Sequence, residues 1–340
     1  MRDEALPWPN HRRTPARRTG VTGVSGVDPS VATVARMWDF YLGGCDNYDA
    51  DRKAARLVIA AAPHIVDAAA ANRAFAHRVI GSAAAHGIQR FLDLGCGLPT
   101  LSPTHRVARS WRSRARTLYV DRDLQVVHHA RHLLGDDSGA AAVCGDIRDI
   151  DAILGHPTTR ALFAGGPRVC VLMLGVGHFV AEGLDLVTAT LRRRLPSGSL
   201  LAISHAVPGA ADRSGCDAVK AIYASIGSPL HLRSADQVAA LFDGWQIEPA
   251  DWTRTAQQPV PLHAWRPDIG EPVGHSIDAM TAVVGRIPER GTPAWNPWPA
   301  RRPRPAEAQH RRRRPRPPTP AIPGTGPTTH SPHRHRKHDQ

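Results

Sequence analysis

The stretch FLDLGCGLPT, residues 91–100, decides the fold expected for this chain. It reads as a short apolar strand, 90–94, followed by two glycines one residue apart, Gly95 and Gly97. In an open α/β sheet, ligands bind beyond the carboxyl ends of the strands. Glycines at that point let the backbone turn tightly and approach a ligand closely. The stretch therefore predicts the first strand of an α/β sheet with a nucleotide or nucleoside site at its end.

An acid and a missing glycine narrow the choice of nucleotide. A dinucleotide-binding turn needs the pattern G-x-G-x-x-G, but position 100 is Thr and Pro99 precedes it. Asp93, two residues before the first glycine, is unfavourable beside a pyrophosphate. The same carboxylate suits the α-ammonium group of S-adenosylmethionine. A nicotinamide-dependent oxidoreductase is therefore the less favoured interpretation.

Two later strands are also followed by or end in acids. TLYVD ends in Asp121, 24 residues after Gly97, where a carboxylate can accept both ribose hydroxyl protons. The segment CGDI places Asp146 and Ile147 where an adenine would lie, with the acid for the amino group and the apolar side chain for the ring. Either acid alone could instead cap the following helix. The three acids together, in this order, favour a pocket for S-adenosylmethionine.

Short apolar strands alternate with helical stretches, which predicts a mostly parallel sheet with helices on both faces. The expected strands cover 90–94, 117–121, 140–144, 168–175 and 198–205, and 245–252 with 260–267 complete a seven-stranded sheet. The expected helices cover 103–112, 123–134, 148–163, 182–195, 212–226 and 234–242. Two Ala-rich stretches, 50–62 and 66–86, are helical by propensity and form an N-terminal helical arm.

The net charge of +13 lies at the two ends of the chain. Residues 269–340 carry 13 Lys+Arg against 5 Asp+Glu, and residues 1–27 carry 5 against 2, so 28–268 holds 25 against 23. The C-terminal segment also contains 14 of the 30 prolines. Such segments cannot bury enough apolar surface to offset chain entropy. We therefore expect disordered basic ends at 1–27 and 268–340 around one folded domain, 28–267.

S-adenosylmethionine is a methyl donor, so the chain is expected to be a methyltransferase. The near-neutral domain has no basic stripe that could follow a phosphate backbone, so we expect the molecule that accepts the methyl group to be small. One alternative is an RNA methyltransferase anchored by its basic tail, and another is a non-catalytic ligand-binding or regulatory protein. The five cysteines are scattered, and the histidines lack ligand spacing, so neither a disulfide frame nor a metal site is expected. No apolar run suits a membrane helix, and MRDEALPWPN is not a signal peptide, so we expect a cytoplasmic location.

Several blocks of the sequence resemble a known family. In chain order they are ARMWDFYLGGCDNYDADRKAA, ANRAF, FLDLGCGLPT, YVDRD, GHFV, PSGSLLAISHA and LRSADQVAALFDG. This is the order seen in the actinobacterial S-adenosyl methyltransferase family, formerly a domain of unknown function. The resemblance covers about residues 28–267, and LGGxDN above all is not a general methyltransferase motif. It implies a Rossmann-like class I methyltransferase fold with S-adenosylmethionine as cofactor.

The resemblance also implies roles for individual residues. The cofactor site it implies consists of Asp93, Gly95 and Gly97 at the methionine end, Arg73 for the methionine carboxylate, Asp121 for the ribose, and Asp146 with Ile147 for the adenine. In the N-terminal block, Gly43 and Gly44 suit a hinge, and Asp46 and Asn47 suit the polar tip of an arm that closes over a ligand. An ordinary turn between two helices is the alternative for these four residues.

Two histidines follow strands at positions where an acceptor would lie. They are His178 in LGVGHF and His205 in AISHA. Methyl transfer from a sulfonium is an in-line displacement, so the protein mainly aligns the acceptor with the methyl group. Either histidine could take a proton from an acceptor hydroxyl or amine. A structural role at the end of a strand is the alternative for each.

Overall fold

The fold is built on one mixed sheet with parallel strands at its centre. The computed structural model describes residues 28–100, 102–137, 139–208, 213–250, 257–267 and 279–289. The strands are β1 (Arg90–Leu94), β2 (Arg116–Asp121), β3 (Ala140–Cys144), β4 (Cys170–Leu174), β5 (Leu200–Ala206), β6 (Gln246–Ile247), β7 (Val260–Pro261) and β8 (Met280–Arg286). Their order is β3-β2-β1-β4-β5-β8-β6, and β7 also pairs with β8. The first five strands are parallel, whereas β8 runs antiparallel to β5.

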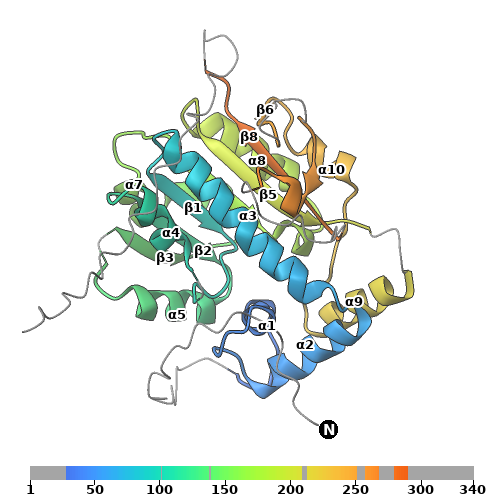
Figure 1. Ribbon diagram of the computed structural model, residues 1–340. Helices are drawn as coiled ribbons and strands as arrows, with labels where there is room; N and C mark the ends of the chain where they lie inside the picture. Colours follow the sequence, from blue (N-terminus) through green and yellow to red (C-terminus); the bar gives the residue numbers. More distant parts are fainter. Residues whose placement is uncertain are drawn as a thin grey trace, which may run out of the picture. The chain divides into compact units, whose positions relative to one another are not determined.

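Helices cover both faces of this sheet, as the alternating pattern predicted. The helices are α1 (Val34–Tyr41), α2 (Asp49–Ala61), α3 (Ile65–Ala85), α4 (Thr104–Trp111), α5 (Leu124–Leu134), α6 (Ile150–Gly155), α7 (Pro157–Leu162), α8 (Leu184–Arg194), α9 (Arg213–Ser225) and α10 (Ala235–Ala240). One face packs on α3, α4 and α5, and α3 runs across it (Figure 1). The other face packs on α6, α7, α8 and α10.

The strand β8 corrects the predicted domain boundary. It lies beyond residue 267, where the sequence predicted the domain to end, yet it forms a ladder with β5 along the whole of Met280–Arg286. All of its residues except Arg286 are buried. The sheet consequently has eight strands rather than seven. The predicted disorder of residues 1–27 and of the tail after 289 concerns residues outside those described.

Other boundaries differ from the expectation for local reasons. The stretch 148–163 forms two helices instead of one, because Pro157 begins α7 and the Nδ1 atom of His156 accepts a hydrogen bond from the backbone of Thr158 (3.2 Å). The expected strands 245–252 and 260–267 shorten to two residues each.

A buried ionic cluster ties the last strands to α3. Glu248, immediately after β6, accepts hydrogen bonds from Arg266 (3.0 Å) and Arg286 (2.6 Å). Arg266 also donates to the hydroxyl of Ser82 in α3 (2.9 Å). Glu248 and Arg266 are each 3% exposed, so each charge depends on the others for compensation. Glu248, Arg266 and Arg286 are thereby part of the folded domain.

Of the N-terminal helices, α1 and α2 form an arm that packs with α9, whereas α3, which the sequence also assigned to the arm, packs on the sheet. Met37, Tyr41, Val58 and Tyr223 are buried together between α1, α2 and α9. A buried ion pair between Arg36 and Asp51 (2.7 Å) joins α1 to α2. Within the described segments, no single helix is long and apolar enough to cross a membrane. Only α2 and α3 taken together, bent by 103°, reach that length and apolarity.

Candidate active site

A cavity of about 510 Å³ opens at the carboxyl ends of the parallel strands. All of the residues predicted to hold the cofactor line it: Arg73, Asp93, Gly95, Gly97, Asp121, Asp146 and Ile147. They come from α3 and from the ends of β1, β2 and β3, as expected for the crevice where strand order reverses. The structure therefore brings these residues together, while their individual contacts to a cofactor stay predictions.

The two glycines of the β1 turn adopt backbone conformations that favour glycine. Gly95 has φ 66° and Gly97 has φ 58°. At Gly95 a Cβ atom would also lie 2.3 Å from Cγ2 of Val176, so no other residue fits without displacing the β4 loop. At Gly97 the nearest atom to such a Cβ is 4.0 Å away, on Ala35, so a ligand can approach the backbone there.

Asp121 fixes this turn from the neighbouring strand. Its carboxylate accepts hydrogen bonds from the backbone of Gly97 (3.0 Å) and Asp123 (3.0 Å). Burial raises the pKa of Asp121 above its usual value, while those two hydrogen bonds lower it. The residue that caps α5 is Asp123, not Asp121. Each carboxylate oxygen keeps a lone pair for a second donor, as a ribose hydroxyl would require.

Asp93 and Arg73 lie at the methionine end predicted for the cofactor. Asp93 accepts a hydrogen bond from the hydroxyl of Thr104 (2.6 Å), and burial raises its pKa to about 6. The positive charge of Arg73 lowers that pKa, so the two groups are near each other. Across the described segments of the chain, no hydrogen bond or ion pair involves the Arg73 side chain. A carboxylate paired with Arg73 and an ammonium beside Asp93 would satisfy both groups.

The adenine end shows one feature that the sequence did not predict. Asp146 binds its own neighbour, Arg148, through two guanidinium nitrogens (3.0 and 2.6 Å). This pairing lowers the pKa of Asp146, so the carboxylate is ionised and can accept a further hydrogen bond. Ile147 is buried beside it. The cap of α6 is Asp149, so Asp146 is not the helix cap that the alternative required.

The residues present fit S-adenosylmethionine. The cofactor supplies a methyl group activated by a sulfonium. The chain supplies a negative charge for the ammonium group and a positive charge for the carboxylate. Arg73 and Asp93 would hold the amino-acid end, Asp121 the ribose, and Asp146 with Ile147 the adenine. The open space beside the backbone of Gly97 leaves room for the ligand. Among the described residues, no cluster of His, Cys, Asp or Glu could hold a metal ion.

His178 and His205 do not face this cavity, contrary to the proposed role as a base. His178 is 3% exposed and His205 is fully buried, and neither lines the cavity. The Nδ1 atom of His178 accepts from the backbone of Ala206 (3.3 Å). The Nε2 atom of His205 lies 3.1 Å from Nη1 of Arg233, and its Nδ1 donates to the carbonyl of Ala206 (2.7 Å). Both rings therefore fix the end of β5, which is the structural alternative.

This burial makes the fold sensitive to acid. Burial lowers the pKa of His178 to about 3 and that of His205 to about 4. The unfolded chain, with a histidine pKa of about 6.5, thus binds more protons below that pH. The contribution of these two histidines to stability is fully present above about pH 6.5. It is lost as the pH falls toward their pKa values in the folded protein.

We expect the free energy of unfolding to drop by a few kcal/mol between about pH 7 and about pH 5, at about 1.4 kcal/mol per unit of pKa difference. The raised pKa of Asp93 offsets a smaller part of this loss. Urea unfolding at several pH values measures it. His178→Gln, which keeps an acceptor for the Ala206 amide, should flatten the pH dependence. An unchanged pH slope in that variant would contradict the assignment.

The glycine block of the arm also lies outside the cavity lining. Gly43, Gly44, Asp46 and Asn47 form the turn between α1 and α2, which is the alternative that the sequence left open. The part of the arm that covers the cavity is α1, which lines it with Val34, Ala35, Trp38 and Asp39.

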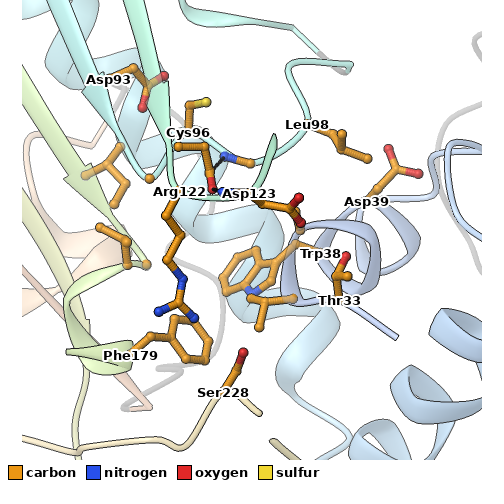
Figure 2. Close-up of a pocket in the computed structure, with 18 of the residues that line it drawn as sticks. Thr33, Trp38, Asp39, Asp93, Cys96, Leu98, Arg122, Asp123, Phe179 and Ser228 are labelled. Carbon is orange, nitrogen blue, oxygen red and sulfur yellow. Dashed lines mark hydrogen bonds between the residues drawn. The ribbon is translucent and has the colours of Figure 1, made fainter. Parts of the chain in front are cut away.

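Several residues missed at the sequence level complete the cavity. Trp38 and Asp39 reach it from α1, Phe179 from the segment after β4, and Ser228 from beyond the end of α9 (Figure 2). Asn72 lines it from α3. No pattern in the sequence pointed to them, because Trp38, Asp39 and Asn72 lie within helices and only the packing of those helices brings them to the cavity.

Comparison with known proteins bears on the fold and the family. Two solved structures share the fold along nearly their whole length. A putative methyltransferase from Thermobifida fusca is 29% identical, with a TM-score of 0.69, and the match covers 76% of this chain and 96% of that one. A DUF574 family protein from Streptomyces avermitilis is also 29% identical with a TM-score of 0.69, covering 77% and 99%. No curated protein matches the chain.

The family match extends past the boundary set by the sequence blocks. Residues 22–288 match the S-adenosyl methyltransferase family, and this range includes β8. The Rossmann-like class I methyltransferase fold and the S-adenosylmethionine cofactor expected from the sequence are confirmed by that match. The chain therefore belongs to the S-adenosyl methyltransferase family.

Proposed function

We propose that this S-adenosylmethionine-dependent methyltransferase methylates a small molecule bound in the apolar part of its cavity. The observation that carries the proposal is that α1 covers the same cavity that the candidate cofactor residues line. Val34, Ala35, Trp38 and Leu42 of this segment all line the cavity. A small acceptor can be enclosed beneath such a cover and aligned with the methyl group.

The acceptor end combines aromatic rings with few polar groups. Trp38 and Phe179 flank it, and Ser228 lies beyond them (Figure 2). Asn72 is oriented there because its Oδ1 accepts a hydrogen bond from the hydroxyl of Ser204 (2.6 Å). A Cβ at Gly175 would lie 3.3 Å from Nδ2 of Asn72 and 3.6 Å from Trp38. The amide nitrogen thus faces the end of β4, where it can donate to an acceptor.

The charges around the cavity favour a small acceptor over RNA. The charged residues that line it are Asp39, Asp93, Asp121, Asp123 and Asp146 against Arg73, Arg122 and Arg148. A groove that follows a phosphate backbone needs an excess of positive charge. This lining has an excess of acids, so it suits a small ligand better than a segment of an RNA strand.

The test measures S-adenosylhomocysteine formation by the full chain with S-adenosylmethionine and two fractions of a cell extract. One fraction contains metabolites and the other contains RNA. We expect product with the metabolite fraction, resistant to ribonuclease and absent in Asp121→Ala. Product only with the RNA fraction, lost after ribonuclease treatment, would overturn the proposal and favour the RNA methyltransferase.

A further inference from the structure

Asp39 in α1 is a buried acid whose carboxylate accepts three hydrogen bonds and pairs with no cation among the described residues. It is 3% exposed, and it borders the cavity beside Trp38. Its Oδ1 accepts from the hydroxyl of Thr100 (2.8 Å). Its Oδ2 accepts from the backbone of Asp46 (2.8 Å) and from Nδ2 of Asn47 (2.9 Å). One carboxylate thereby joins α1, the turn between α1 and α2, and the glycine turn after β1.

The α1–α2 turn is shaped to hold this carboxylate. A Cβ at Gly44 would lie 2.1 Å from Oδ1 of Asp39, so only glycine fits there. The backbone of Gly44 donates to the Asp39 carbonyl (2.8 Å). Arg52 orients Asn47 by donating to its side-chain oxygen (3.0 Å) and its carbonyl (2.7 Å). The segment LGGCDN, in which the sequence suited Gly43 and Gly44 to a hinge and Asp46 and Asn47 to a tip, forms a turn that binds the Asp39 carboxylate.

Through Thr100, Asp39 also reaches the glycine turn after β1, residues 95–100, which is called the cofactor turn below. Thr100 follows Gly97 by three residues, and Gly97 donates to the ribose-binding candidate Asp121. The turn 95–100 is therefore fixed by Asp121 at one end and by Asp39 at the other. Any force that moves α1 away from the sheet also pulls on this turn.

We propose that Asp39 is a positioning residue that latches α1 onto the cofactor turn through Thr100, so that α1 retains the bound cofactor. Two other contacts keep the arm attached when the latch is broken. Arg36 donates to the side chain of Gln125 in α5, and His129 Nε2 lies 3.9 Å from the Asp46 carboxylate. Loss of the latch should consequently open the cover without unfolding the arm. The proposal does not depend on the identity of the acceptor.

Burial and the nearby charge of Asp46 raise the pKa of Asp39, whereas the hydrogen bonds from Thr100 and Asn47 lower it. The negative charge is thus costly at this position, and hydrogen-bond geometry rather than charge explains the residue. An amide can reproduce that geometry. Its oxygen can accept from Asp46 and Asn47, while its nitrogen donates to the Thr100 hydroxyl.

The test compares four variants of the full chain for the dissociation rate of S-adenosylhomocysteine. Thr100→Val and Asp39→Ala each break the latch, so we expect dissociation about 10-fold faster or more, as for loss of a hydrogen bond to a charged group. Asp39→Asn should restore a slow rate. Tyr41→Phe is the matched control, because it removes a hydrogen bond of the same helix, to Tyr223 (3.3 Å), outside the latch.

Two further measurements separate a latch from simple packing or direct contact. Amide hydrogen exchange across residues 34–42, with the ligand bound, should accelerate in Thr100→Val and remain slow in Tyr41→Phe. Thr100→Val added to Asp39→Ala should produce little further change, because both remove the same bond. Fully additive effects would show that Thr100 acts on the ligand directly. Either that result or wild-type dissociation in both single variants overturns the proposal.

Discussion

A chain that stops after residue 267 should not fold, and should give no cooperative unfolding transition and no binding of S-adenosylhomocysteine. It lacks β8, which pairs with β5 on one side and with β6 and β7 on the other. Met280, Val283 and Val284 are buried, and each such side chain contributes about 1.5–3 kcal/mol. The truncation also leaves Glu248 without Arg286. These losses are comparable with a typical folding free energy of about 5–15 kcal/mol.

Circular dichroism and thermal melts of two truncations measure this effect. A chain ending at residue 289 is the control, since it keeps every described strand, and the composition of 290–340 predicts no contribution to the core. We expect it to melt near the full-length protein. A stable, ligand-binding chain that ends at 267 would show that β8 is dispensable for the sheet.

Asp121→Ala should weaken binding of S-adenosylhomocysteine by about 100-fold, because two ribose hydrogen bonds to a charged acceptor are lost. The variant also leaves the backbone amides of Gly97 and Asp123 without their acceptor, so the turn itself loosens. Calorimetric titration measures the affinity, and a melt of the same sample checks that the fold survives.

The control is Asp137→Ala, which removes a carboxylate that is paired with Arg109 and lies outside the cavity lining. It should lose some stability while the affinity stays at the wild-type value. Equal loss of affinity in both variants, or wild-type affinity in Asp121→Ala, would contradict the assignment of Asp121 to the ribose.

The parallel half of the sheet could be predicted because each strand is a continuous apolar run next to a helical stretch. Leu92, Leu118 and Val171 belong to such runs and are fully buried. The strand β8 carries a similar run, TAVVG, but this run follows a stretch rich in glycine and polar residues. Its pairing with β5 is a long-range contact that no local pattern encodes. The composition of the surrounding tail therefore outweighed the signal of the strand.

The same contrast holds for the site. Asp93, Asp121 and Asp146 could be predicted because the end of a parallel strand fixes which edge of the sheet a residue occupies. That rule gives the edge but not the direction of the side chain, so His178 and His205 were assigned to the cavity although their rings lie in the interior. Asp39 had no signal at all, because an acid within a helix is ordinary until Thr100 and Asn47 are placed beside it.

The position of β8 also determines the order in which this protein can fold during synthesis. β5 leaves the ribosome well before its neighbour, since 73 residues separate Ala206 from Met280. Until β8 has been made, β5 is a long, apolar edge strand, the kind of surface that pairs wrongly with other chains. The nascent protein therefore holds an unfinished sheet until β8 has been made. We therefore expect a chaperone that shields this edge during synthesis to raise the yield of folded enzyme.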